Sequence, residues 1–317
     1  MVRKVKKKKL RIRLIVAFLL IAVMVAFFYK SIITVGNQYK FEENRGITFS
    51  PSPSVSIPFE NLNSPYAILV CLEDQTIVKE KNSEDKIYPA SLTKIMTAVV
   101  AIENLPDLKD EITLTNSTFE GLYEEGAAMA GFLPGEKVRA IDLLYGVLLP
   151  SGAEACIGLA NHIAGSRQNF VGMMNQKAAD LGMNNTHFAN ATGLHDENHY
   201  TTIKDLAILL NYALRNDTFR EIFTSTCHST QATNKHPDGI TFYSTMFKEL
   251  SSPRITGGEI LGGKTGFTNE AGLCLASLAK VGKQEYLLIT AGAKGDNRSE
   301  KYNIYDALTV YNSLGTD

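Results

Sequence analysis

A serine and a lysine stand three residues apart in the segment YPASLTKIMTAVVAI, at Ser91 and Lys94. Residues i and i+3 are neighbours on one side of a helix, so a hydroxyl and an amine at these positions can meet. Apolar surroundings lower the pKa of a lysine, and the neutral amine can then accept the proton of a serine that attacks a carbonyl carbon. The pair therefore indicates nucleophilic catalysis, although a capping serine and a lysine with its head in water would show the same spacing.

The residues that follow Ser91 predict the element that positions this pair. Apolar residues recur at Leu92, Ile95, Met96, Val99, Val100 and Ile102. This is the spacing of a buried helix face, and Pro89 can set the entry into the helix. We therefore expect an apolar, buried helix whose first turn carries the reactive groups.

Two later segments complete a set of motifs. PSGAEA spans residues 150–155, and GGKTGFT spans residues 262–268. An S-x-x-K pair, a second serine element and K-T-G together are typical of serine penicillin-binding enzymes. From about Tyr66 to its end, the chain resembles the low-molecular-mass penicillin-binding proteins, which are serine-type D-alanyl-D-alanine carboxypeptidases of peptidase family S11. The segment GLHDENHYTTIKDLA is also similar to the sequence that follows the second motif in that family.

The resemblance implies a role for each matching residue. Ser91 would be the nucleophile that forms an acyl-enzyme, and Lys94 would be the base that activates it. Ser151 would be the second serine, which relays a proton toward the leaving group. The backbone N–H groups of Ser91 and Phe267 would form the oxyanion hole, where each donor is typically worth about 10²–10³ in rate.

The K-T-G segment would bind the substrate. By the resemblance, Lys264 contributes a positive charge that attracts an anionic substrate, and Thr265 donates a hydrogen bond to its terminal carboxylate. Gly266 has no side chain, which would let the substrate backbone lie close to the strand.

The activity implied by the resemblance is removal of the terminal D-alanine from peptidoglycan stem pentapeptides, without a metal or a cofactor. β-Lactams would acylate Ser91, because they mimic the D-Ala-D-Ala amide. A D,D-endopeptidase that cuts cross-links and a catalytically weak peptidoglycan-binding homologue stay open as alternatives.

The second motif departs from the family pattern. The family usually has asparagine two positions after the second serine, where this chain has Ala153. Loss of that amide could leave Lys94 short of one hydrogen bond, which costs on the order of 1–3 kcal/mol when the partner stays unpaired. We expect water or Glu154 to take the place of the amide.

Two other enzyme classes fit the sequence less well. A class A β-lactamase needs a glutamate that activates water, and no convincing E-x-x-L-N segment follows Ser151. His195 and His199 have the i, i+4 spacing of zinc ligands, but the motif is neither H-E-x-x-H nor H-x-x-E-H. We therefore interpret these histidines as structural.

The N-terminus carries a separate signal. Residues 1–30 contain nine of the 32 Lys and Arg residues and none of the 33 Asp and Glu residues, and Leu14 to Tyr29 form an apolar run. This pattern is typical of a signal peptide or a signal anchor with its basic end in the cytoplasm. Since no clear A-x-A cleavage site follows, we favour an uncleaved single-pass membrane anchor with the rest of the chain outside the cytoplasm. The remaining residues have a net charge of 23 − 33 = −10, which argues against nucleic acid as a partner.

These features predict three regions. Residues 1–35 form the basic stretch and the transmembrane anchor, and residues 36–64 are a Pro/Ser-rich linker. Residues 65–317 form the peptidase domain. Strand patterns at both ends of this domain enclose a block of helical patterns, which predicts an α+β fold with an antiparallel sheet flanked by helices. Three of the four cysteines lie in apolar stretches, which is typical of small buried hydrophobic residues, although an exterior location would permit a disulfide.

Overall fold

The structure, a computed structural model, describes residues 50–51, 57–296 and 298–315. The predicted basic stretch and anchor at residues 1–35 lie outside the described residues. Among the helices that are described, none combines the length and the apolar character needed to cross a bilayer.

A seven-stranded sheet forms the first layer of the fold, with the strand order β1-β3-β2-β11-β10-β9-β8. The strands are β1 (Ser50–Pro51), β2 (Tyr66–Cys71), β3 (Thr76–Lys81), β8 (Arg254–Ile255), β9 (Gly258–Thr268), β10 (Gly272–Val281) and β11 (Gln284–Ala293). Every pair is antiparallel except β1 with β3, which is parallel and only two residues long. The predicted α+β class with an antiparallel sheet is therefore confirmed, and the parallel β1 is an unexpected addition.

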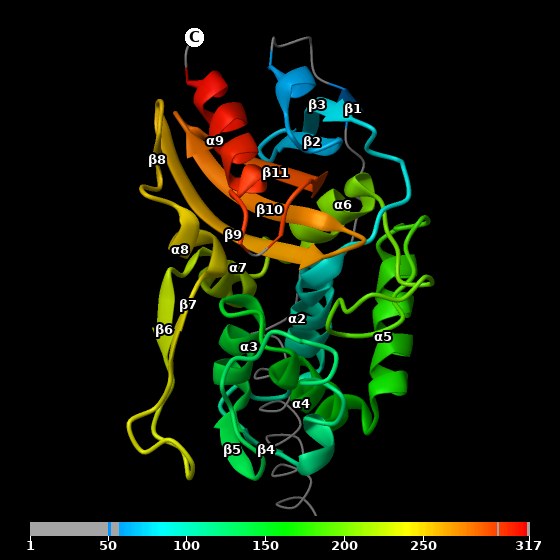
Figure 1. Ribbon diagram of the computed structural model, residues 1–317, viewed down its shortest axis with the longest axis vertical. Helices are drawn as coiled ribbons and strands as arrows, with labels where there is room; N and C mark the ends of the chain where they lie inside the picture. Colours follow the sequence, from blue (N-terminus) through cyan, green and yellow to red (C-terminus); the bar gives the residue numbers. More distant parts are fainter. Residues whose placement is uncertain (1–49, 52–56, 297, 316–317) are drawn as a thin grey trace, which may run out of the picture. The chain divides into compact units, whose positions relative to one another are not determined.

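The helices lie on both faces of this sheet. They are α2 (Thr93–Asn104), α3 (Ala140–Leu148), α4 (Ala153–Ala164), α5 (Arg167–Asp180), α6 (Ile203–Ala213), α7 (Asp217–Thr224), α8 (Thr245–Glu249) and α9 (Tyr302–Leu314). Two small hairpins accompany them, β4 (Glu111–Leu114) with β5 (Glu136–Arg139) and β6 (Cys227–Ser229) with β7 (Thr241–Tyr243). In Figure 1, α9 lies over one face of the sheet, and α2 runs from the sheet into the helical block.

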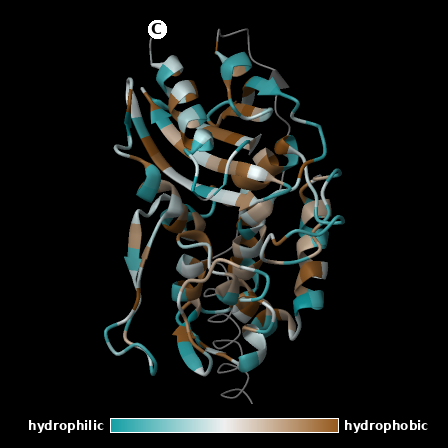
Figure 2. Ribbon diagram, in the orientation of Figure 1, coloured by the Kyte–Doolittle hydropathy of each residue, from teal (hydrophilic) through white to brown (hydrophobic). Residues whose placement is uncertain are grey.

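The core follows the apolar patterns of the sequence. Ile304 and Val310 of α9 pack with Leu275 of β10 and Leu288 of β11 in one cluster of buried side chains. Figure 2 shows hydrophobic residues along α2 and in the strands of the sheet, and hydrophilic residues in many of the outer loops. All four cysteines are free thiols, and Cys227 alone among them is exposed.

The domain begins earlier than predicted. Phe59, inside the expected linker at 36–64, is fully buried in the cluster beneath α9. Asp306 of α9 accepts a hydrogen bond from the backbone N–H of Asn63 at 2.9 Å. Residues 57–64 therefore belong to the folded domain, and the prediction of a linker is wrong for them. Proline and serine content obscured the apolar residues that anchor this segment.

The sheet and the helical block meet closely at the start of α2. The 3-10 turn η2 (Ala90–Leu92) precedes α2 and lies against β9 at Gly266. A Cβ atom at Gly266 would lie 3.1 Å from the backbone nitrogen of Ser91 and 3.3 Å from that of Leu92. These neighbours are backbone atoms that cannot move independently, so the missing side chain is what lets β9 approach the turn.

Gly266→Ala should destabilise the fold by about 1–3 kcal/mol, since the added methyl group overpacks a contact between two backbone segments. Gly172→Ala is the matched control, because a Cβ atom at that position in α5 would meet nothing within 4 Å. Alanine is favoured over glycine in a helix by about 0.5–1 kcal/mol, so the control should be neutral or stabilising. Urea unfolding of the full chain measures both, and equal stability of the two variants would contradict the close approach of β9.

Candidate active site

Three segments that are distant in the sequence converge on one cleft of about 350 Å³. The S-x-x-K turn, the Ser151 turn and the K-T-G segment of β9 all contribute to its lining, with Ser91, Lys94, Ser151, Thr265, Gly266 and Phe267. Lys264 lies behind them and is fully buried. The structure thus brings together every site residue that the sequence singled out.

The Ser91–Lys94 pair has the geometry that its spacing predicts. Lys94 Nζ lies 3.1 Å from Ser91 Oγ and also donates a hydrogen bond to the carbonyl oxygen of Thr192 at 2.5 Å. Ala90, immediately before the serine, has a φ of 47°, which places it in the left-handed region. Such a conformation costs a non-glycine residue roughly 1–2 kcal/mol, and strain of this kind is often found at functional sites.

Ser151 also has a left-handed backbone, with a φ of 68°. Its hydroxyl accepts a hydrogen bond from Lys264 Nζ at 2.9 Å, and the same amine donates to the carbonyl oxygen of Thr265 at 2.7 Å. The next residue must be glycine, because a Cβ atom at Gly152 would lie 2.6 Å from the Cβ atom of Ala130. The second serine and the sheet lysine therefore form a second hydroxyl–amine pair in the cleft.

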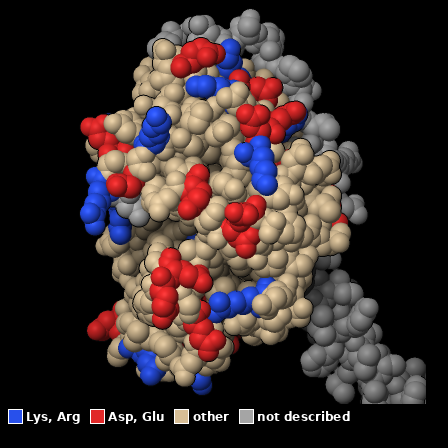
Figure 3. Space-filling model, turned by 45° about the vertical axis from the view of Figure 1, so that its right-hand side comes forward, with Lys and Arg blue, Asp and Glu red and all other residues tan. Residues whose placement is uncertain are grey.

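Both amines are buried among partners that carry no full charge. Within the described part of the chain, Lys94 and Lys264 make no ion pair with an acidic side chain. Burial lowers the pKa of Lys94, although Glu154 acts in the opposite direction. On the face shown in Figure 3, acidic and basic side chains are interspersed over the surface, whereas these two lysines lie beneath it.

Lys264 differs from its sequence-based expectation in its electrostatics. Burial lowers its pKa well below the ordinary lysine value, and the positive charge of Lys94 adds to the effect. The environment thus opposes the positive charge that was expected of Lys264.

Thr245 is a part of the site that sequence reasoning missed. Its hydroxyl lies 2.7 Å from the hydroxyl of Thr265, and the residue lines the cleft at the start of α8. Ser244 caps this short helix by accepting from the backbone N–H of Phe247. No motif in the sequence distinguishes Thr245 from other threonines, because its importance comes only from its position opposite the K-T-G segment.

Glu154 does not take the place of the missing asparagine. Its Oε1 accepts hydrogen bonds from the backbone N–H groups of Ala130, Gly131 and Phe132 at 2.7–3.2 Å. The expectation that this carboxylate substitutes for an amide at Ala153 is therefore wrong. Glu154 instead holds the loop before β5, and the carbonyl oxygen of Thr192 supplies the hydrogen-bond acceptor for Lys94.

The two histidines considered as zinc ligands have other partners. His199 is buried, with Nε2 at 2.7 Å from Thr93 Oγ1 and Nδ1 accepting from the backbone N–H of Ala189 at 3.1 Å. His195 lies 3.8 Å from a carboxylate oxygen of Glu270. Within the part of the chain that is described, no group of three or more His, Cys, Asp and Glu residues gathers as a metal site would. The structural interpretation of His199 is confirmed.

Comparison with curated proteins gives consistent relatives. D-alanyl-D-alanine carboxypeptidase DacF of Bacillus subtilis (strain 168) is 32% identical over 229 residues, which cover 72% of this chain and 57% of the relative. D-alanyl-D-alanine carboxypeptidase DacC of Escherichia coli (strain K12) is 33% identical over 249 residues, covering 74% of this chain and 58% of the relative. The chain therefore spans less than two thirds of the length of these two proteins.

Solved structures and a family model agree with these relatives. The crystal structure of the Streptomyces K15 DD-transpeptidase matches with a TM-score of 0.71 and 26% identity, over 82% of this chain and 98% of that chain. The D-alanyl-D-alanine carboxypeptidase of Mycobacterium tuberculosis H37Rv, 24% identical with a TM-score of 0.71, covers 84% of this chain and 96% of its own and shares the fold. The model of the Peptidase_S11 family, described as D-alanyl-D-alanine carboxypeptidase, matches residues 52–295. On this evidence the chain belongs to the S11 family of D-alanyl-D-alanine carboxypeptidases.

Proposed function

We propose that the protein is a serine D-Ala-D-Ala carboxypeptidase that removes the terminal D-alanine from peptidoglycan stem pentapeptides. One observation carries this proposal: the buried amine of Lys94, whose pKa is lowered, lies 3.1 Å from the hydroxyl of Ser91 in an open cleft. Family membership supports the choice of substrate, since the family model and the curated relatives are described by this activity.

The proposed acylation uses the two hydroxyl–amine pairs in turn. Neutral Lys94 accepts the proton of Ser91 as the serine oxygen attacks the carbonyl carbon of the D-Ala-D-Ala amide. The backbone N–H groups of Ser91 and Phe267 stabilise the resulting oxyanion. The carbon–nitrogen bond then breaks, and Ser151, hydrogen-bonded to Lys264, relays the proton taken up by Lys94 to the nitrogen of the departing D-alanine. Water then hydrolyses the ester on Ser91 and regenerates the hydroxyl.

The same cleft has groups that suit a terminal carboxylate. Thr265 and Thr245 place two hydroxyl groups side by side on its lining, 2.7 Å apart. A carboxylate bound there would raise the pKa of the nearby Lys264, because an opposite charge favours the ammonium form. Substrate binding would thus counteract the effect of burial on the pKa of Lys264.

Penicillin should label the protein covalently on Ser91, because the β-lactam amide occupies the position of the D-Ala-D-Ala amide. Labelling of the full chain with a fluorescent penicillin measures this, and Ser91→Ala should abolish it. Ser117→Ala, which removes an exposed hydroxyl outside the cleft, is the matched control and should leave labelling unchanged.

The reaction products distinguish the carboxypeptidase from the D,D-endopeptidase and from the catalytically weak homologue. Release of D-alanine from a stem pentapeptide supports the carboxypeptidase. Labelling without that release, together with cleavage of cross-linked dimers, would favour the D,D-endopeptidase. Labelling with turnover of neither substrate would leave the catalytically weak homologue. Labelling that persists in Ser91→Ala would mean that the nucleophile is another residue.

Acylation should depend on pH through Lys94, which acts as a base only when it is neutral. The rate falls as the pH falls and the amine becomes protonated. Since burial lowers the pKa of Lys94 from its ordinary value of 10.5, the rise of the rate with pH should have its midpoint below pH 10.5. The second-order rate constant of acylation, measured between about pH 5 and 10, tests this because it reports the ionisation of the free enzyme.

Two variants accompany this pH profile. Lys94→Met should lose acylation at every pH, whereas Lys109→Met, at an exposed position, should keep the parental profile. A rate that begins to rise only near pH 10 would contradict a lowered pKa for Lys94.

We further propose that residues 1–35 anchor the protein in the cell membrane and that its peptidase domain is extracytoplasmic. The support is the basic stretch followed by the apolar run from Leu14 to Tyr29. The full chain should remain with the membrane fraction after carbonate extraction, and deletion of residues 1–35 should release it. A mature protein that is cut after residue 30 and is freely soluble would refute the anchor.

A further inference from the structure

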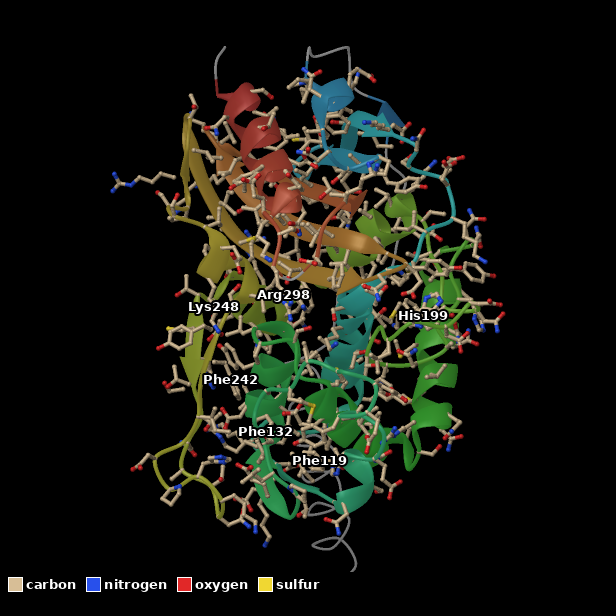
Figure 4. All side chains as sticks on the ribbon, in the orientation of Figure 1. Phe119, Phe132, His199, Phe242, Lys248 and Arg298 are labelled. Carbon is tan, nitrogen blue, oxygen red and sulfur yellow. The ribbon has the colours of Figure 1, made fainter. Side chains whose placement is uncertain are left out.

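His199 does not line the cleft, yet it contacts the segment that carries the reactive pair and the loop that binds Lys94. It is 2% exposed and comes shortly after the loop of residues 189–194. Figure 4 labels this side chain. Its partners lie on the Ser91 turn on one side and on the 189–194 loop on the other. These contacts suggest a role beyond the filling of space.

The hydrogen bonds of His199 have one consistent direction. Nδ1 accepts from the backbone N–H groups of Ala189 at 3.1 Å and Asn190 at 3.4 Å, so this nitrogen carries no proton. The neutral ring must then carry its proton on Nε2, which donates to Thr93 Oγ1 at 2.7 Å. The Thr93 hydroxyl is left to donate to the carbonyl oxygen of Ala90 at 2.8 Å. A directed chain therefore runs from the loop, through His199 and Thr93, to the residue before Ser91.

At the Ala90 end, this series of hydrogen bonds fixes a strained turn. Ala90 has left-handed backbone angles that are unfavourable for alanine. Its carbonyl oxygen also faces Gly193, where a Cβ atom would lie 2.0 Å away. The hydrogen bond from Thr93 and this close packing together hold the peptide that presents Ser91.

At the other end, the hydrogen bonds to His199 fix the 189–194 loop, which binds Lys94. Within that loop, the side-chain oxygen of Asn190 accepts from the N–H groups of Thr192 at 3.1 Å and Gly193 at 2.7 Å. The carbonyl oxygen of Thr192 in turn accepts from Lys94 Nζ. His199 joins this ordered loop to the Ser91 turn, so it relates the position of the amine to that of the hydroxyl.

The environment of His199 favours the uncharged ring. Burial lowers its pKa from 6.5 to about 4, although Asp196 acts in the opposite direction. Positive charge on His187, His195 or Lys94 lowers the pKa further. At neutral pH the ring therefore offers one donor and one acceptor, as the directed chain requires.

We propose that His199 is a positioning residue for the reactive pair: its neutral ring links the 189–194 loop to the Ser91 turn through Thr93 and so sets the alignment of Ser91 with Lys94. This inference rests on the proposed acylation of Ser91. It assigns His199 no contact with the substrate, and it requires the hydrogen-bonding capacity of the ring rather than its volume.

The test is the acylation kinetics of the full chain with fluorescent penicillin, resolved into a noncovalent binding constant and an acylation rate constant. His199→Phe and Thr93→Val keep most of the volume and leave buried partners unpaired, so each should lower the acylation rate constant about tenfold or more. The binding constant should stay within about threefold, since neither residue lines the cleft.

Conservative variants separate hydrogen bonding from packing. His199→Gln retains a donor and an acceptor, and Thr93→Ser retains the hydroxyl, so both should acylate within about threefold of the parent. The double variant His199→Phe/Thr93→Val should be about as slow as the slower single variant, because both changes break one chain. His162→Gln, on an exposed part of α4, is the control and should match the parent.

Parental rates in His199→Phe and Thr93→Val, or an equal loss in His199→Gln and His199→Phe, would overturn the proposal. Amide hydrogen exchange gives a readout that does not need acylation. Exchange in residues 88–94 and 189–194 should be faster in His199→Phe and Thr93→Val and parental in His199→Gln. Absence of that difference would also overturn it. If the parent itself is not acylated, the proposed function fails while the exchange data still decide the role of His199.

Discussion

The burial of two lysine amines among neutral hydrogen-bond partners, in one cleft, is the constraint on which the rest of the site depends. An ammonium group removed from water is costly unless it is paired, so burial lowers the pKa of Lys94 and of Lys264. A carboxylate beside Lys94 would restore its charge and remove its value as a base. Polar atoms that carry no full charge fill this position instead, namely the hydroxyl of Ser91 and the carbonyl oxygen of Thr192.

Holding neutral partners at hydrogen-bonding distance requires a rigid backbone, because neutral hydrogen bonds are weaker than charged ones. The structure meets this requirement with two residues in left-handed conformations, Ala90 and Ser151, each directly at a reactive segment. Close backbone packing stabilises both turns. Gly266 and Gly193 contact the turn at Ala90. Gly152 contacts Ala130 next to the turn at Ser151. The strain and the glycines are thus parts of one arrangement.

The fold class and the reactive residues could be predicted from the sequence because both have local signatures. Helical spacing after Ser91 and the three short motifs can be recognised without knowledge of distant contacts. Thr192, by contrast, contributes a carbonyl oxygen to Lys94 across 98 positions of sequence, and every residue has such an oxygen. His199 meets Thr93 across 106 positions. The short elements β5, β6, β7 and α7 have no such local signature, since few residues give too little periodicity to recognise.

The hydrogen bond from Lys94 to the main chain also explains how the site can have Ala153 where the family usually has asparagine. Residue 153 begins α4 and its backbone N–H is already used, donating to the carbonyl oxygen of Ala128 at 2.7 Å. A short apolar side chain there leaves no buried amide in need of partners, and Lys94 keeps a backbone acceptor that no side-chain substitution removes. The site therefore holds its amine through the main chain of the 189–194 loop. The position of the Lys94 amine therefore depends on the hydrogen bonds that hold the 189–194 loop, and not on the second motif alone.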